Sequence, residues 1–63
     1  MNEQAFRLTA YFTAPTFPAQ AVLFEEADGA RVRYFWELRD GSKLPCSPEF
    51  VKARRHAWTR RPV

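Results

Sequence analysis

The segment of residues 20–46, QAVLFEEADGARVRYFWELRDGSKLPC, decides the fold because it holds the turn signals of two β-hairpins. An Asp-Gly pair stands at positions 28–29 and again at 40–41, each between apolar segments. A three-residue loop that ends in glycine forms a type I turn followed by a bulge, which is a common hairpin connection. The segment therefore predicts three consecutive antiparallel strands, at about residues 20–26, 30–39 and 42–46. Pro45 restricts the last of these to an edge of the sheet.

The two loops also predict the register of the strands. With residues 27–29 as the first loop, Glu25 lies opposite Arg31. With residues 39–41 as the second loop, Glu37 lies opposite Lys43. Both registers place opposite charges across from each other, which stabilises a strand pair. A two-residue Asp-Gly loop would instead shift the first register by one and place Glu25 opposite Val32.

Further elements are predicted on either side of this segment. Residues 6–13, FRLTAYFT, alternate between apolar and polar side chains, which is typical of a half-buried strand. Residues 14–19 contain two prolines and indicate an ordered loop. Ser47 is a suitable cap for a helix whose first residue is Pro48. We expect this helix over about residues 48–59, followed by a basic tail at residues 60–63.

These elements predict an α+β fold: an antiparallel β-meander of three or four strands with one C-terminal helix packed on one face. Residues 1–63 would form a single small domain, whose core must be dense in large apolar side chains. Aromatic residues make up 16% of the chain, which suits such a core. The sheet residues expected beneath the helix are Phe6, Leu8, Phe12, Val22, Phe24, Val32, Tyr34, Trp36, Leu38 and Leu44. The helix residues expected to meet them are Phe50, Val51, Ala57 and Trp58.

The sequence argues against an enzyme, and no cofactor is expected. It contains no phosphate-binding glycine loop and no zinc-protease or serine-hydrolase motif. Cys46 and His56 are the only soft ligand candidates, which are too few for a structural zinc site, so no metal is expected. The longest purely apolar run is residues 21–24, and the first residues lack the pattern of a signal peptide. We therefore expect a cytoplasmic protein that makes no membrane contact.

Two surfaces are candidates for binding. On the sheet face away from the helix, cations would alternate with exposed rings, as phosphate contact and base stacking require. The residues expected there are Arg7, Tyr11, Arg31, Arg33, Phe35, Arg39 and Lys43. The second surface is the C-terminal segment, because residues 52–63 hold five basic residues and no acidic one. Its candidate residues are Lys52, Arg55, Arg60 and Arg61, whereas Arg54 lies within the apolar stripe and is expected to stack on an aromatic ring or extend to solvent.

Other interpretations of the sheet face remain open. It can be an ordinary solvated surface with ion pairs between strands. Alternatively, Phe35, Leu23, Tyr11 and Phe17 form a small second core under the proline-containing loop. An exposed aromatic patch also suits a protein partner or a homodimer.

We expect a small non-enzymatic binding protein that engages nucleic acid with its basic sheet face and its basic C-terminal helix. The alternative is a protein-interaction module, such as a small inhibitor or adaptor of the phage or mobile-element type. A meander followed by one helix resembles, in its order of elements, the sheet-reading DNA-binding domains of the integrase arm-binding type. This resemblance implies a DNA-binding sheet and carries no individual site residues over to this chain.

Overall fold

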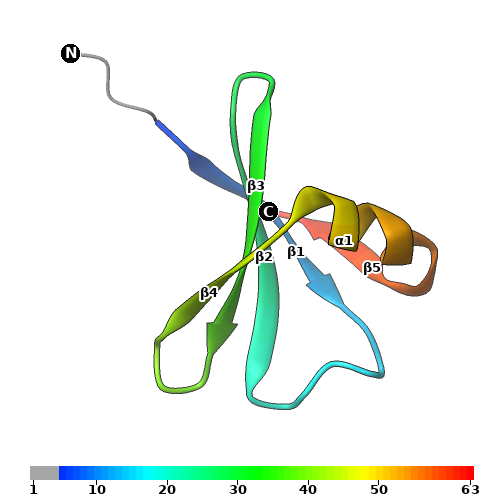
Figure 1. The fold of residues 1–63 in the computed structure, drawn as a ribbon. Helices are drawn as coiled ribbons and strands as arrows, with labels where there is room; N and C mark the ends of the chain where they lie inside the picture. The colour runs from blue at the N-terminus through cyan, green and yellow to red at the C-terminus, as the bar shows by residue number, and fades with distance from the viewer. Residues whose placement is uncertain (1–4) are drawn as a thin grey trace.

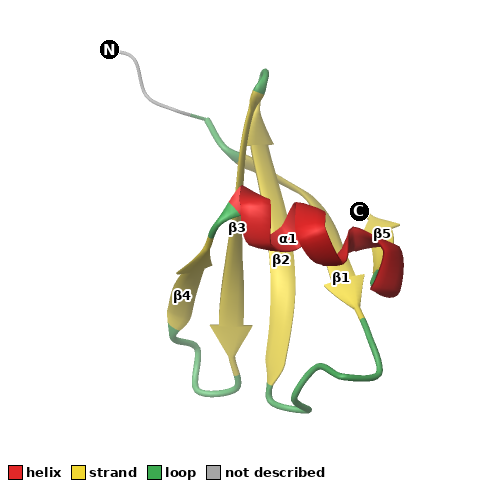
Figure 2. Cartoon of the chain, turned by 45° about the vertical axis from the view of Figure 1, so that its right-hand side comes forward, coloured by secondary structure: helices red, strands yellow, loops and turns green. Residues whose placement is uncertain are grey.

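The computed structural model describes residues 5–63 and contains one five-stranded antiparallel sheet. The strands are β1 (Arg7–Thr13), β2 (Ala21–Asp28), β3 (Arg31–Leu38), β4 (Lys43–Cys46) and β5 (Thr59–Pro62). Their spatial order is β4-β3-β2-β1-β5, so a four-stranded meander is completed by a last strand beside β1 (Figure 1). Helix α1 (Pro48–Arg54) and the 3₁₀ turn η1 (Arg55–Ala57) cross one face (Figure 2). The predicted α+β fold class is confirmed.

Strand β5 is the main addition to the predicted architecture. The sequence predicts a helix to about residue 59 and a tail over residues 60–63, whereas the helical segment ends at Ala57 and residues 59–62 form a strand. Ala10 of β1 lies opposite Pro62, and the Val63 N–H donates to the Thr9 carbonyl at 3.0 Å. An arginine-rich segment without apolar alternation carries no strand signal. Its pairing therefore depends on contacts that form only in the folded chain.

The hairpin between β3 and β4 has the predicted register. Glu37 lies opposite Lys43, and Trp36 lies opposite Leu44. The Gly41 N–H donates to the Leu38 carbonyl at 2.9 Å, which closes the turn. Gly41 has a φ of 92°, in the region that favours glycine. The prediction of a three-residue loop ending in glycine is confirmed here.

The hairpin between β2 and β3 has a different loop from the predicted one. β2 continues to Asp28, which lies opposite Arg31, so the loop is the two residues Gly29 and Ala30. Gly29 has a φ of 63°, and no non-glycine residue in the described part of the chain has a positive φ. A positive φ at the first central residue alone is the pattern of a type II′ turn, which favours glycine at that position.

This register turns β2 over relative to the prediction. Glu25 lies opposite Tyr34, whereas the sequence predicts Arg31, three residues earlier. A shift by an odd number of residues exchanges the two faces of a strand. Leu23 and Glu25 of β2 therefore face α1, whereas Val22, Phe24 and Glu26 face away from it. The prediction fails because both faces of β2 carry large apolar side chains, so hydrophobicity does not select one register.

Strand β1 contains a β-bulge that changes two further predictions. The register with β2 shifts between Leu8 and Ala10, which leaves Thr9 as the extra residue. Ala10 and Phe12 lie on the helix side and are buried, as predicted for Phe12. Leu8, predicted in the core, turns to the opposite face and is 43% exposed. Arg7, predicted on that opposite face, turns to the helix side.

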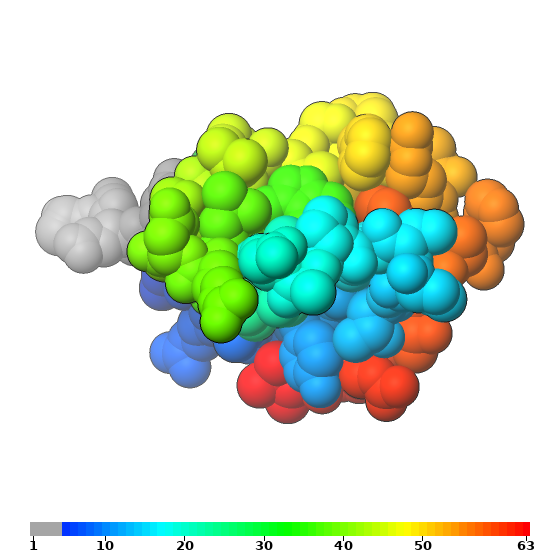
Figure 3. All heavy atoms as spheres, turned by 90° about the horizontal axis from the view of Figure 1, so that it is seen from below, coloured from blue at the N-terminus to red at the C-terminus, as the bar shows by residue number. Residues whose placement is uncertain are grey.

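The core lies between the sheet and α1 and consists largely of aromatic rings. Phe17, from the proline-containing loop, makes T-shaped contacts with Trp36 and Trp58, each with ring centroids 4.9 Å apart. Such pairs contribute about 0.5–1.5 kcal/mol beyond the burial of their area. Figure 3 shows this loop (cyan) beside the helical segment (yellow to orange). Phe17 thus joins the main core and does not form a second core with Phe35. The fully buried apolar residues are Ala10, Phe12, Leu23 and Val51.

Helix α1 begins as predicted and packs differently. Ser47 Oγ accepts a hydrogen bond from the Phe50 N–H at 3.1 Å, and Pro48 occupies the first turn. Within α1 only Val51 is buried. Phe50 is 38% exposed and lies under the guanidinium of Arg54, whose carbon is 3.7 Å from the ring centroid. The predicted core residues that remain more than a third exposed are Leu8, Val22, Val32, Leu44, Phe50 and Ala57.

Candidate functional site

The open face is the face of the sheet opposite α1. The registers of the four strand pairs align one residue from each strand in a continuous row across it. We call this the aromatic row. In spatial order from β4 to β5 it consists of Pro45, Phe35, Phe24, Tyr11 and Arg61. Its three rings are half-buried and its two ends are exposed, so solvent reaches an apolar strip that crosses four strands and ends at the charged Arg61 on β5.

The centre of the aromatic row is a stacked pair of rings. The centroids of Phe24 and Phe35 are 5.5 Å apart, and the ring planes differ by 28°. The Lys43 ammonium lies 5.3 Å from the centroid of Phe35. Such a contact between a cation and a ring at an exposed site is weak, about 0.5–1 kcal/mol. The open face therefore combines a stacked apolar centre with a weakly held cation.

A second group of charges lies beside the aromatic row, near the tip of the β2–β3 hairpin. Arg33 Nε donates to Glu26 Oε1 at 2.8 Å, which forms an ion pair across the two strands. The guanidinium carbon of Arg33 is 3.9 Å from the centroid of Phe6, and that of Arg31 is 5.7 Å from the same ring. Phe6, predicted in the core, thus supports two cations. The ring and Glu26 hold the Arg33 guanidinium in place, while four more N–H groups remain on it as donors.

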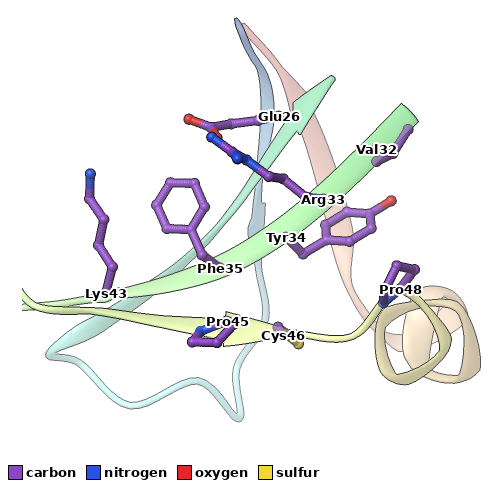
Figure 4. Close-up of a pocket in the computed structure, with 9 residues that line it drawn as sticks. All are labelled: Glu26, Val32, Arg33, Tyr34, Phe35, Lys43, Pro45, Cys46 and Pro48. Atoms are coloured by element: carbon purple, nitrogen blue, oxygen red, sulfur yellow. The ribbon is translucent and has the colours of Figure 1, made fainter. Parts of the chain in front are cut away.

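A pocket of about 410 Å³ opens where these two groups meet. Figure 4 shows the Phe35 ring standing between the Lys43 side chain and the pair formed by Arg33 and Glu26. The pocket continues around the outer edge of β3, since β4 pairs only with the part of β3 from Tyr34 onward. Its lining residues are Glu26, Val32, Arg33, Tyr34, Phe35, Lys43, Pro45, Cys46 and Pro48.

The charges of the open face are close to balance. The formal excess is one positive charge, because the face carries four cations and three acids. The cations are Arg31, Arg33, Lys43 and Arg61, and the acids are Glu26, Asp28 and Glu37. Six of the predicted site residues lie on this face: Tyr11, Arg31, Arg33, Phe35, Lys43 and Arg61. Val22, Phe24 and Glu26, which the sequence did not place there, arrive with the reversed face of β2. The sequence signal for this face of β2 is Gly29 followed by Ala30, because a glycine in the first position suits a type II′ turn and that turn fixes the register.

The other predicted site residues lie elsewhere. Arg39 is exposed in the turn between β3 and β4, and Arg7 lies on the helix side of β1. Lys52 and Arg55 are exposed on the helical segment, on the side of the sheet that α1 covers. Arg60 also lies on that side, where it is paired with a carboxylate. The sheet thus separates the predicted basic residues into two groups.

Arg60 belongs to a partly buried network centred on Glu25, which is 6% exposed. Arg60 Nη2 donates to Oε1 of Glu25 at 2.7 Å, and its Nε donates to Oε2 at 3.2 Å. The hydroxyls of Thr9 and Tyr34 donate to the same carboxylate at 2.8 and 3.2 Å. The bond from Arg60 is the largest influence on the pKa of Glu25, which lies below its ordinary value. Burial and the nearby carboxylate raise the pKa of Tyr34. This two-point pairing joins β5 to the sheet.

Cys46 is a half-buried free cysteine at the end of β4. Burial raises the pKa of the Cys46 thiol, which disfavours the thiolate that nucleophilic chemistry needs. His56 is exposed in η1.

Within residues 5–63, no group of three His, Cys, Asp or Glu side chains could hold a metal ion. In the same part of the chain, no helix is long and apolar enough to span a membrane. Comparisons with protein-family models, curated proteins and solved structures found no match.

Proposed function

We propose that this chain is a small non-enzymatic binding protein whose open face engages nucleic acid. One observation carries the proposal: an aromatic row crosses all five strands and has cations at both ends. Arg61 lies at one end, and Lys43 and Arg33 lie near the other. A surface that binds nucleic acid needs cations to contact the phosphates and flat apolar rings on which the bases stack. The row supplies both within one surface.

The proposal differs from the sequence-based expectation in the role of the C-terminal helix. Because α1 packs on the opposite side of the sheet, its cations do not extend the open face. We therefore leave Lys52 and Arg55 out of the interface. Arg60 is left out as well, because its guanidinium already pairs with Glu25 at two points.

The experiment compares two double variants that each lose two positive charges. Lys43→Ala/Arg61→Ala removes cations from the open face, and Lys52→Ala/Arg55→Ala removes two from the helix side. Fluorescence anisotropy with labelled single-stranded and duplex oligonucleotides, over a series of salt concentrations, measures affinity. For single strands, log K falls with log salt by about 0.7 per phosphate contact, so the first variant should flatten the slope by about 1.4. The second variant should retain the slope of the natural sequence.

Two outcomes would contradict the proposal. One is an equal effect of the two double variants, which would mean that binding follows net charge rather than the open face. The other is the absence of binding to any oligonucleotide at about 50 mM salt, where phosphate contacts are strong.

A protein partner is the second candidate, and the nearly balanced charge of the open face favours it. Glu26 and Glu37 lie beside the aromatic row, and the aliphatic residues Leu8 and Val22 flank it. Such a mixed surface suits a protein interface, which includes one with a second copy of this chain. Here we expect a complex with weak salt dependence. Sedimentation of Phe35→Ala beside the natural sequence tests the homodimer, since loss of the ring would shift a dimer toward monomer.

A further inference from the structure

We propose that the ligand of the open face is a single-stranded nucleic acid, and that one of its bases stacks on Phe35 in the pocket beside Lys43. This inference rests on the proposed function and specifies which form of nucleic acid the face binds. The pocket volume of about 410 Å³ lies within the range of roughly 300–1,000 Å³ that is usual for small ligands. The pocket is thus of a size to receive a single base.

The arrangement around Phe35 suits a base with phosphates on both sides. The ring stands between the Lys43 side chain and the Arg33–Glu26 pair (Figure 4). Lys43 has a flexible stem, and its ammonium is only 5.3 Å from the ring centroid. A base that enters the pocket displaces this ammonium from the ring, and the ammonium then meets a neighbouring phosphate. The donors that remain on Arg33 meet the phosphate on the other side.

The acids on the open face favour a single strand over a duplex. A duplex presents one negative charge for about each 1.7 Å of its axis, and its bases are stacked on one another. Laid across the aromatic row, it would bring phosphates against Glu26 and Glu37 while keeping its base faces hidden. A single strand can turn its bases toward the rings and its phosphates toward Lys43 and Arg61. Carboxylate oxygens beside the row can then accept hydrogen bonds from the N–H groups of the bases.

The test separates the contribution of bases from that of phosphates. A labelled oligothymidylate of about ten nucleotides, an abasic strand of equal length and a duplex are compared by fluorescence anisotropy. Phe35→Leu removes the flat ring and retains an apolar side chain beside Phe24, so it should fold. Phe50→Ala, which removes a partly exposed ring on the helix side, is the control for the loss of a ring away from the open face. Circular dichroism checks that both variants are folded.

We expect the natural sequence to bind the oligothymidylate about 5- to 150-fold more tightly than the abasic strand, which is the range for one stacked base. Phe35→Leu should lose most of this gain and keep its affinity for the abasic strand, whereas Phe50→Ala should keep both. Equal, salt-dependent binding of the two strands, or tighter binding of the duplex, would overturn the stacking inference and leave the proposed function standing. No binding to any strand would overturn both.

Discussion

Replacing Arg60 by alanine should destabilise the protein far more than its partly exposed position suggests. The side chain of Arg60 is 37% exposed, whereas its partner Glu25 is buried beneath the helical layer. The substitution removes two hydrogen bonds, of 2.7 and 3.2 Å, and leaves the carboxylate with only the hydroxyls of Thr9 and Tyr34. A buried carboxylate without its counter-charge is costly, because neither water nor a cation compensates the lost hydration.

The magnitude follows from the burial of each partner. Breaking a fully buried ion pair costs about 3–5 kcal/mol, and the partial exposure of Arg60 places this pair near the lower limit, about 3 kcal/mol. A chain of this length has a total free energy of unfolding of roughly 3–9 kcal/mol. The variant would therefore lose a third or more of its stability. Its midpoint in urea would fall by about 3 M if the m value is about 1 kcal/mol/M.

The assay is urea denaturation followed by tryptophan fluorescence, since Trp36 and Trp58 both lie in the core cluster. Arg61→Ala is the matched control. Arg61 is the next residue on the same strand, lies opposite Tyr11 and is exposed, so its loss should change stability by less than about 0.5 kcal/mol. If the two variants have the same midpoint, the Glu25 network does not hold β5 to the sheet and our reasoning is refuted.

Three further predictions concern stability. Because the pKa of Glu25 is lowered in the folded state, its contribution is complete above the ordinary value of 4.5 and is lost as pH falls through the folded pKa. Urea midpoints measured below about pH 5 should therefore fall more steeply for the natural sequence than for Glu25→Gln, and parallel profiles would contradict this. Gly29→Ala and Gly41→Ala should each cost about 1 kcal/mol in urea denaturation, because both glycines have positive φ; unchanged midpoints would count against the turn assignments. Trp36→Ala should cost about 3–5 kcal/mol and Phe50→Ala clearly less, so equal losses in the same assay would disprove the described core.

The elements that could be predicted from sequence are those whose signals are local. The loop ending in Gly41, with Glu37 opposite Lys43, is specified by residues within a few positions of one another. The start of α1 is likewise specified by Ser47 and Pro48. On the open face, the correct placements belong mostly to β3, whose alternation does not depend on which loop precedes it.

The elements that could not be predicted depend on contacts between distant residues. β2 has apolar side chains on both faces, so its orientation is decided by the contacts of Glu25 with β1 and β5 rather than by its own pattern. The bulge at Thr9 places that hydroxyl on the same carboxylate. The pairing of β5 with β1 depends on the same network, because Arg60 of β5 donates to Glu25. The sequence pairs Glu25 with Arg31 across the hairpin, whereas in the structure Glu25 pairs with Arg60 of β5. Because this error reverses the two faces of β2, it also misplaces Phe24.

The place of β5 at the end of the sheet sets the order in which the protein can assemble. The first four strands are joined by short connections and can pair as they emerge during synthesis. β5 must instead close a loop from Ala10 to Pro62, nearly the whole chain, so we expect it to join last. Until then the outer edge of β1 is open to other chains, and the unpaired Glu25 carboxylate faces inward beside it. An inward charge near an open edge discourages association with a second molecule. We therefore expect the Glu25 carboxylate to have two roles: it holds β5 in the folded protein, and it disfavours aggregation before β5 has paired.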